Sequence, residues 1–124
     1  MEKPTNMASI AEIQARVSQE FQIPVEIIQK KGSKVECVIA RHTSYYLCYK
    51  IGHRNRRELS RTHGVKYWGG WVHYIIKNIE NLKDTDPIFK VKLNKLLNSL
   101  GINPAKEKII HQLKEIQNQI HING

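Results

Sequence analysis

The chain has 124 residues, of which 40% are hydrophobic and 25% are charged, and its formal net charge is +9. This length fits one domain with at most a short appended element, and the composition is that of a folded globular chain, which excludes general disorder. No run approaches the roughly 18 apolar residues of a membrane span. The first residues, MEKPTNMASIAEIQ, contain no apolar signal core, so we expect a cytoplasmic protein without a membrane partner.

The positive charge is concentrated in one part of the chain. Residues 30–66, called here the basic segment, contain ten Lys or Arg and two Glu, a net charge of +8. Residues 1–29 carry −2 and residues 67–124 carry +3. Such a concentration is typical of proteins that bind a polyanion. An anionic membrane surface would also attract it, but the basic residues do not form one face of a long amphipathic helix.

The first third of the chain predicts two helices after a flexible start at residues 1–8. Ser9 and Glu12 form a capping box, and apolar residues then recur at helical spacing over about 9–21, namely Ile10, Ile13, Val17 and Phe21. Pro24 suits the first turn of a second, short helix, which carries Val25, Ile27 and Ile28.

A basic, glycine-containing loop at residues 30–34 precedes a long apolar helix predicted over residues 35–51, with Gly52 as its C-terminal cap. Cys37 and Cys48 are the only cysteines of the chain. Eleven residues apart on one helix, they would lie about 16 Å apart by helical rise, too far for a disulfide. We interpret both as packing residues.

Two helices joined by a short turn are predicted next, the first in the second half of the basic segment and the second directly after it. A basic connector at 53–57 leads into a short helix over 56–63, and Gly64 with Val65 forms a turn. The next helix is expected to begin at residue 67 or 71 and to end at residue 82, with its inner face formed by Val72, Ile75, Ile76, Ile79 and Leu82. This order matches the helix-turn-helix pattern.

The remaining residues predict two more amphipathic helices. A polar linker at 81–86 ends at Asp86, which caps a helix opened by Pro87 and ended by Gly101, with the stripe Ile88, Val91, Leu93, Leu96, Leu97 and Leu100. The final helix, about 105–121, carries Ile109, Ile110, Leu113, Ile116 and Ile120. No strand pattern appears, so the sequence predicts an all-α domain of five to seven helices, with residues 9–100 as the domain and 101–124 as an appended element.

The order of these motifs resembles the C-terminal DNA-binding domain (domain IV) of the bacterial chromosomal replication initiator DnaA, a TrpR-like helix-turn-helix domain. The resemblance covers residues 9–100. Its clearest parts are the basic loop at 30–34, Val38-Ile39-Ala40-Arg41 followed by Tyr46-Leu47, Glu58-Leu59, and Gly64 at the turn. It implies a compact helical fold, binding of double-stranded DNA, and a role in DNA replication or its regulation.

The recognition-helix signature of that family is absent from this chain. The family has Gly-Arg-Asp-His-Thr-Thr-Val, whereas this chain has Lys66-Tyr67-Trp68-Gly69-Gly70-Trp71-Val72. The His-Thr-Thr side chains that read the DnaA box are missing, and so is the ATPase region of the initiator. The resemblance therefore implies a duplex DNA binder with altered or weak sequence specificity.

The DNA contacts expected from this reading fall into two groups. Phosphate contacts, which position a protein without reading sequence, are expected from Lys30, Lys31, Lys34, Arg41, Arg54, Arg56, Arg57, Arg61 and Lys66. Base contacts are expected from Lys66, Tyr67, Trp68, Trp71 and His73. Aromatic rings pack on thymine methyl groups but lack the bidentate geometry of Arg or Asn, so the specificity is expected to be modest.

Two other binding functions stay open. The tryptophans flanking Gly69-Gly70 could instead form a docking surface for a replication or regulatory protein, because aromatic residues are frequent in binding hot spots. They could also stack on single-stranded DNA or RNA. The stripe of the last helix could pair two subunits as a homodimer or pack on its own domain.

An enzymatic function is not expected, because no histidine lies in a catalytic or metal-binding motif. The six histidines are His42, His53, His63, His73, His111 and His121. For the same reason we expect no cofactor and no metal.

Overall fold

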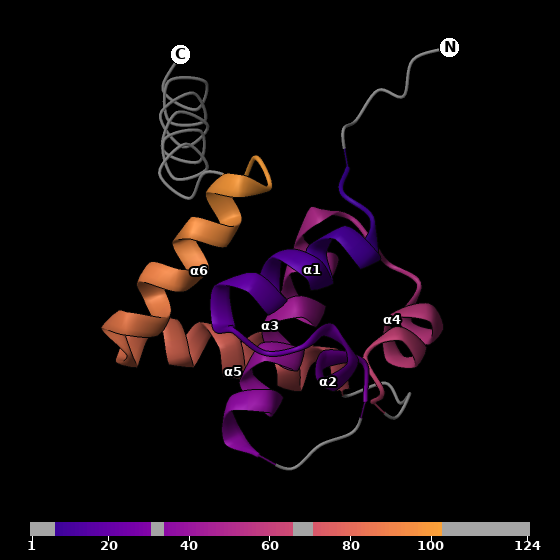
Figure 1. Cartoon of the computed structure of the whole chain (residues 1–124), viewed down its shortest axis with the longest axis horizontal. Helices are drawn as coiled ribbons and strands as arrows, with labels where there is room; N and C mark the ends of the chain where they lie inside the picture. The colour runs from indigo at the N-terminus through magenta and orange to yellow at the C-terminus, as the bar shows by residue number, and fades with distance from the viewer. Residues whose placement is uncertain (1–6, 31–33, 66–70, 103–124) are drawn as a thin grey trace, which may run out of the picture.

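The computed structural model describes residues 7–30, 34–65 and 71–102. In these ranges the chain is all-α, as predicted, with no strand (Figure 1). The six helices are α1 (Ile10–Phe21), α2 (Val25–Gln29), α3 (Val35–Ile51), α4 (Arg56–Thr62), α5 (Trp71–Thr85) and α6 (Pro87–Ser99).

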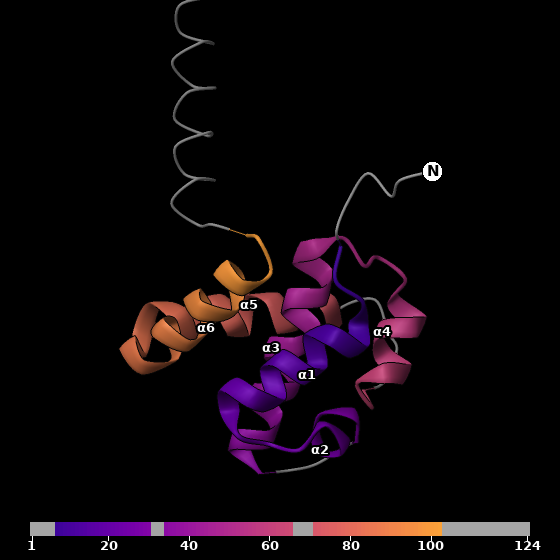
Figure 2. The ribbon, with the colours of Figure 1, turned by 45° about the horizontal axis from the view of Figure 1, so that its top comes forward.

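The long helix α3 forms the centre of the domain. Nine consecutive residues, 40–48, are buried, so this part of the helix is covered on all sides, as is usual for a central helix. It packs against α1, α2 and α5, and α6 packs against α5 and α1. In Figures 1 and 2, α4 and α6 lie on opposite sides of this centre.

The helix ends follow the predicted capping chemistry. The Ser9 side chain accepts a hydrogen bond from the backbone N–H of Glu12, and α1 ends at Gln22 in the left-handed region with φ 55°. Helix α3 ends at Gly52 with φ 129°, a conformation that side chains rarely adopt. A side chain there would also meet Met7, because a Cβ would lie 3.1 Å from the Met7 sulfur.

Helix α5 buries the face that the sequence predicts but is longer than predicted. Val72, Ile75 and Ile79 are buried, and Ile76 and Leu82 pack partly buried against them. The prediction of a polar linker at 81–86 is wrong, since α5 continues to Thr85. The Thr85 hydroxyl donates to the carbonyl of Asn81, which satisfies a backbone acceptor near the helix end.

Helix α6 begins as predicted, because the Asp86 carboxylate accepts hydrogen bonds from the backbone N–H groups of Ile88 and Phe89. Its predicted apolar stripe is partly wrong. Ile88 and Val91 are 72% and 56% exposed, and Phe89 is buried in their place. The helix is rotated so that its buried residues are Phe89, Leu93, Leu96 and Leu97.

Within residues 7–30, 34–65 and 71–102, no helix combines the length and apolar character needed to cross a membrane.

Candidate nucleic-acid interface

Most predicted phosphate contacts that the structure describes have exposed side chains. Lys30 follows α2 and Lys34 precedes α3, so these two residues are the described ends of the basic loop. Both are exposed. A further group surrounds α4, where Arg54, Arg57 and Arg61 are exposed and Arg56 is partly exposed.

Helix α4 presents its arginines in a defined way. Asn55 caps the helix by accepting a hydrogen bond from the Glu58 N–H at 3.1 Å. Leu59 is fully buried and anchors the helix, while Arg57 and Arg61, four residues apart, lie on one face. Just before the helix, the Arg54 guanidinium lies 3.9 Å from the ring centroid of Tyr49. This cation–π contact holds the Arg54 side chain against the surface while it remains exposed.

Arg41 is an exception, and the prediction that it contacts phosphate is wrong for this conformation. Its side chain is only 3% exposed. The guanidinium donates to the carbonyls of Ile28 at 3.2 Å and Ile27 at 2.8 Å, and also to the carbonyl of Lys30. Arg41 therefore caps the C-terminal end of α2, where free carbonyls and the helix dipole favour a cation. Burial lowers the pKa of its guanidinium.

A buried glutamine joins the same end of α2 to the end of α4. Gln14, on α1, is 1% exposed. Its amide nitrogen donates to the carbonyl of Thr62 at 2.8 Å, and its amide oxygen accepts from the side chain of Gln29 at 3.0 Å. Gln29 is the last residue of α2 and Thr62 the last of α4. The two helix ends are thus connected through two side chains, those of Gln14 and Gln29.

The end of α4 is also bonded to α3, through His63. Its Nδ1 lies 2.9 Å from the carbonyl oxygen of Leu59, and its Nε2 lies 2.7 Å from the Ser44 hydroxyl oxygen. Because a carbonyl only accepts, Nδ1 carries the proton and Nε2 accepts from Ser44. Burial, together with the nearby Arg41 and His42, lowers the pKa of His63 to about 4. His63 is therefore neutral at pH 7.

The Ser44–His63 pair has the donor order of a nucleophile and its base, but it is closed to substrates. Both residues have 0% exposure, and a reacting group must come within hydrogen-bond distance of such a pair. We assign the pair to the packing of α3 against α4. The neighbouring thiol of Cys48 is unreactive as well, because burial raises its pKa to about 12.

The outer face of α5 contributes residues that the sequence prediction missed. His73 was predicted and is exposed, and Tyr74 and Lys77 are exposed on the same helix. Tyr74 makes an edge-to-face contact with His42, with ring centroids 6.1 Å apart. Burial and the charge of Arg41 lower the pKa of His42 to about 4. The helical period could have identified Tyr74 and Lys77, because burial of 72, 75 and 79 turns 73, 74 and 77 outward.

Several predicted contacts lie outside the described residues. These are Lys31, Lys66, Tyr67, Trp68 and the side chain of Trp71. The appended helix over about 105–121 lies outside them as well.

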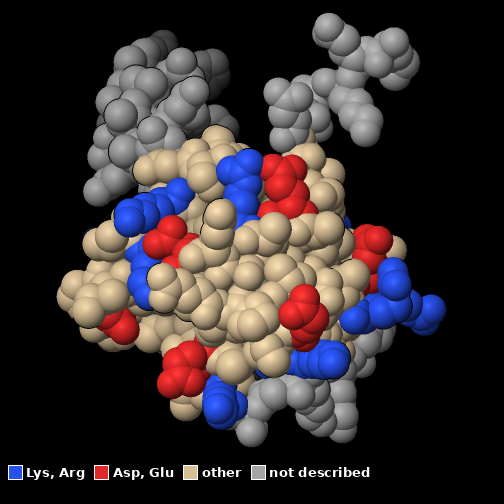
Figure 3. All heavy atoms as spheres, viewed as in Figure 1, with Lys and Arg blue, Asp and Glu red and all other residues tan. Residues whose placement is uncertain are grey.

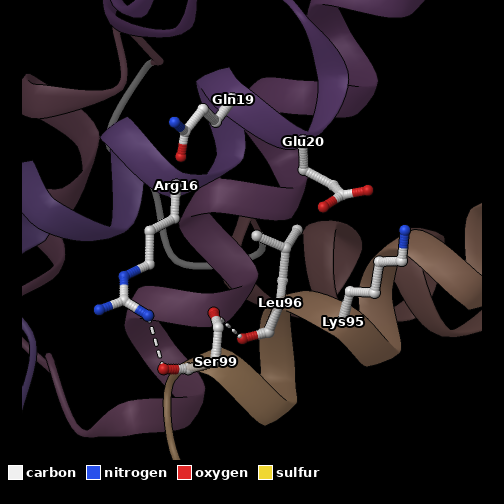
Figure 4. Close-up of a pocket in the computed structure, with 6 residues that line it drawn as sticks. All are labelled: Arg16, Gln19, Glu20, Lys95, Leu96 and Ser99. Carbon is white, nitrogen blue, oxygen red and sulfur yellow. Dashed lines mark hydrogen bonds between the residues drawn. The ribbon is translucent and has the colours of Figure 1, made fainter.

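A groove of about 540 Å³ lies between α1 and α6 (Figure 4). Arg16, Glu20 and Lys95 line it, with Gln19, Leu96 and Ser99. Arg16 donates to the carbonyl of Ser99 at 2.5 Å and pairs with Glu12 at 2.7 Å. The groove therefore has mixed charge and no histidine or cysteine. Figure 3 shows basic and acidic side chains interspersed on the face that carries α1, α2, α4 and α6 in the view of Figure 1, so this face is not uniformly positive.

Among the described residues, no group of His, Cys, Asp and Glu is arranged to hold a metal ion. Neither the scan against protein-family models nor the search of curated proteins found a match for this chain.

Proposed function

We propose that this protein binds duplex DNA through its basic loop and the α4–α5 pair, in the manner of the DnaA DNA-binding domain but with altered or weak sequence specificity. The observation that carries the proposal is the exposure of cations from two parts of the basic segment, which the side chain of Gln14 connects through partly buried hydrogen bonds. The exposed cations include Lys30 at the start of the loop and Arg61 on α4. Gln14 connects the end of α2, which precedes Lys30, to the end of α4.

The arrangement of α4 and α5 supports a helix-turn-helix role. Helix α4 has 7 residues and α5 has 15, and α5 follows α4 directly in the chain. In helix-turn-helix proteins the second helix enters the major groove while the first crosses the backbone. Here α5 buries Val72 and Ile75 against α3 and exposes His73, Tyr74 and Lys77. In the proposed complex, the exposed side chains of α5 would face base edges and the exposed arginines of α4 would face phosphates.

The test is fluorescence-anisotropy binding to a random-sequence duplex and to a duplex containing a DnaA box, at 50 and 200 mM salt. If six to ten phosphate contacts form, the affinity should fall about 10³–10⁵-fold between the two salt concentrations. The two duplexes should bind within about tenfold of each other, because the family's base-reading side chains are absent and a lost base contact costs about 1–3 kcal/mol. Absence of binding at 50 mM salt would refute the proposal.

The matched variants are Arg57→Gln with Arg61→Gln on α4, and Lys90→Gln with Lys95→Gln on α6. Both pairs remove two exposed charges, but only the first lies in the proposed interface. The α4 pair should lower the slope of log affinity against log salt by about 2, at 0.9 for each phosphate contact. The α6 pair should leave the slope nearly unchanged.

A second candidate function is docking of a replication or regulatory protein through large apolar side chains that are exposed. Val35, Tyr74, Ile88 and Val91 are 70%, 50%, 72% and 56% exposed. Side chains of this kind at a surface are used for protein contacts when they are contiguous. The same binding measurement with single-stranded DNA tests the third alternative, in which aromatic residues stack on single strands. A protein of that kind binds single strands more tightly than duplex.

A further inference from the structure

We propose that Arg41 and Gln14 are positioning residues that hold the described ends of the basic loop, Lys30 and Lys34, in a fixed arrangement relative to α4, so that these cations and those of α4 bind the same DNA duplex. This inference rests on the proposed function and deepens it. Neither side chain reaches solvent, with 3% and 1% exposure respectively. Their role in binding would therefore be exerted through the groups that they hold, which are backbone carbonyls and the side chain of Gln29.

The first part of the argument concerns the position of the loop. Helix α2 has only 5 residues, and a helix that short is not stable by its own hydrogen bonds. Its last carbonyls would need water or a cap. Arg41 supplies the cap, since one planar guanidinium donates to the carbonyls of Ile27, Ile28 and Lys30. The carbonyl of Lys30 belongs to the first residue of the basic loop, so the start of the loop is bound directly to α3.

The second part concerns the other end of the loop. Lys34 is the residue directly before α3, and Arg41 lies on α3 seven residues later. The same helix therefore carries the far end of the loop and, through Arg41, holds its near end. Because a guanidinium presents its donors in a rigid planar fork, it fixes direction as well as distance. A lysine at this position could not hold three carbonyls in the same geometry.

The third part concerns α4. Gln14 bonds the side chain of Gln29, next to Lys30, and the carbonyl of Thr62, next to His63. On α3, Ser44 lies three residues after Arg41, so both project from one side of the helix. Ser44 bonds His63 and Arg41 bonds Lys30. The loop and α4 are thus held twice, by α1 through Gln14 and by α3 through Arg41 and Ser44.

A buried polar network suits this role because hydrogen bonds are directional, whereas apolar contacts are not. Phosphates along DNA have fixed spacing, so two basic elements contribute to the same complex only if their separation matches it. If the distance between the two basic elements did not match the phosphate spacing, only one element would contact the DNA.

The experiment measures the salt dependence of binding of the full chain to a random-sequence duplex. The variants are Arg41→Lys and Gln14→Met, each alone and combined with Lys30→Gln and Lys34→Gln. Arg41→Lys should lower the slope of log affinity against log salt by about 1 to 2 and weaken binding at 50 mM salt about tenfold or more, as expected when one or two phosphate contacts are lost. Gln14→Met should act in the same direction. In the background of Lys30→Gln and Lys34→Gln, neither Arg41→Lys nor Gln14→Met should lower the slope further.

The slope separates positioning from a loss of folding. A variant that is only partly folded binds with an affinity lowered by its competent fraction, which shifts the line at all salt concentrations without changing its slope. If Arg41→Lys does not fold by circular dichroism, Gln14→Met carries the test. The matched control is Arg16→Lys, because Arg16 also holds a helix-end carbonyl, that of Ser99, on the α6 side of the molecule. It should leave the slope unchanged.

Three results would overturn the inference. Unchanged slopes in folded Arg41→Lys and Gln14→Met would show that the network does not position the loop. Equal losses with and without Lys30 and Lys34 would show that its effect does not pass through the loop. If the wild-type chain itself does not bind duplex DNA at 50 mM salt, the proposed function fails first and this inference fails with it.

Discussion

The two sides of α3 are packed by different kinds of contact. On the side of α2 and α4, the buried polar groups Arg41, Ser44, His63 and Gln14 add hydrogen bonds to the apolar anchors Ile28 and Leu59. On the side of α5 and α6, apolar side chains carry the packing, among them Ile75, Ile79, Leu93 and Phe89. Apolar burial contributes most of the stability of a domain, whereas a satisfied polar network specifies one arrangement. We infer that the α5–α6 side stabilises the fold and the α2–α4 side sets its geometry.

The largest expected effect is on the apolar side. Leu93→Ala removes a fully buried side chain of α6 and should lower the free energy of unfolding by about 2–5 kcal/mol, through lost burial and the cavity left behind. Urea unfolding measures it. The folded variant should keep the wild-type slope of DNA affinity against salt. A lowered slope with little loss of stability would reverse the assignment of the two sides.

A smaller effect is expected from acid on the polar side. The pKa of His63 is about 4 in the folded protein, below its ordinary value of about 6.5, so the unfolded chain takes up a proton first as the pH falls. The stability gained by keeping His63 neutral is fully present above pH 6.5 and is lost between pH 6.5 and 4. Between pH 7.5 and 4.5 we expect a loss of about 2–3 kcal/mol from this residue.

Urea unfolding of the wild type and of His63→Leu at the two pH values measures this loss. The pKa of His42 is also about 4, so His42 should cause a similar loss of stability at low pH. That loss should remain in His63→Leu, which keeps His42. The difference in stability between pH 7.5 and 4.5 should therefore fall by about half in His63→Leu. An unchanged difference would show that His63 is not held neutral by its burial. Leu93→Ala is the control, since its cost should be the same at both pH values.

The smallest effect, that of Ile88→Gln, tests the rotation of α6 by comparison with a neighbouring variant whose cost should be as large as that of Leu93→Ala. Ile88→Gln changes a side chain that is 72% exposed and should alter stability by no more than about 0.5 kcal/mol. The adjacent Phe89→Ala, at a residue 4% exposed, should cost about 3–5 kcal/mol. Comparable costs at the two positions, measured by urea unfolding, would mean that Ile88 is covered in solution.

The basic surface could be predicted in part from charge and helical spacing. Exposure of Lys30, Lys34, Arg57 and Arg61 follows from the high cost of burying an unpaired charge. The same rule failed for Arg41, which the end of α2 satisfies through carbonyls that are distant along the chain. A signal was present, since Arg41 is the only charged residue between Cys37 and Tyr49. An isolated charge within an apolar helix is typical of a buried, bonded group.

By itself the sequence determined that the chain is all-α, where most helices begin and end, and that positive charge gathers in residues 30–66. Caps, helical periodicity and composition act locally, so they can be read without the fold. Only the tertiary structure decided which face α6 buries, that α3 is covered on all sides, and that Gln14 joins the ends of α2 and α4. These depend on contacts between residues up to 48 positions apart, and no local pattern specifies which distant groups will meet.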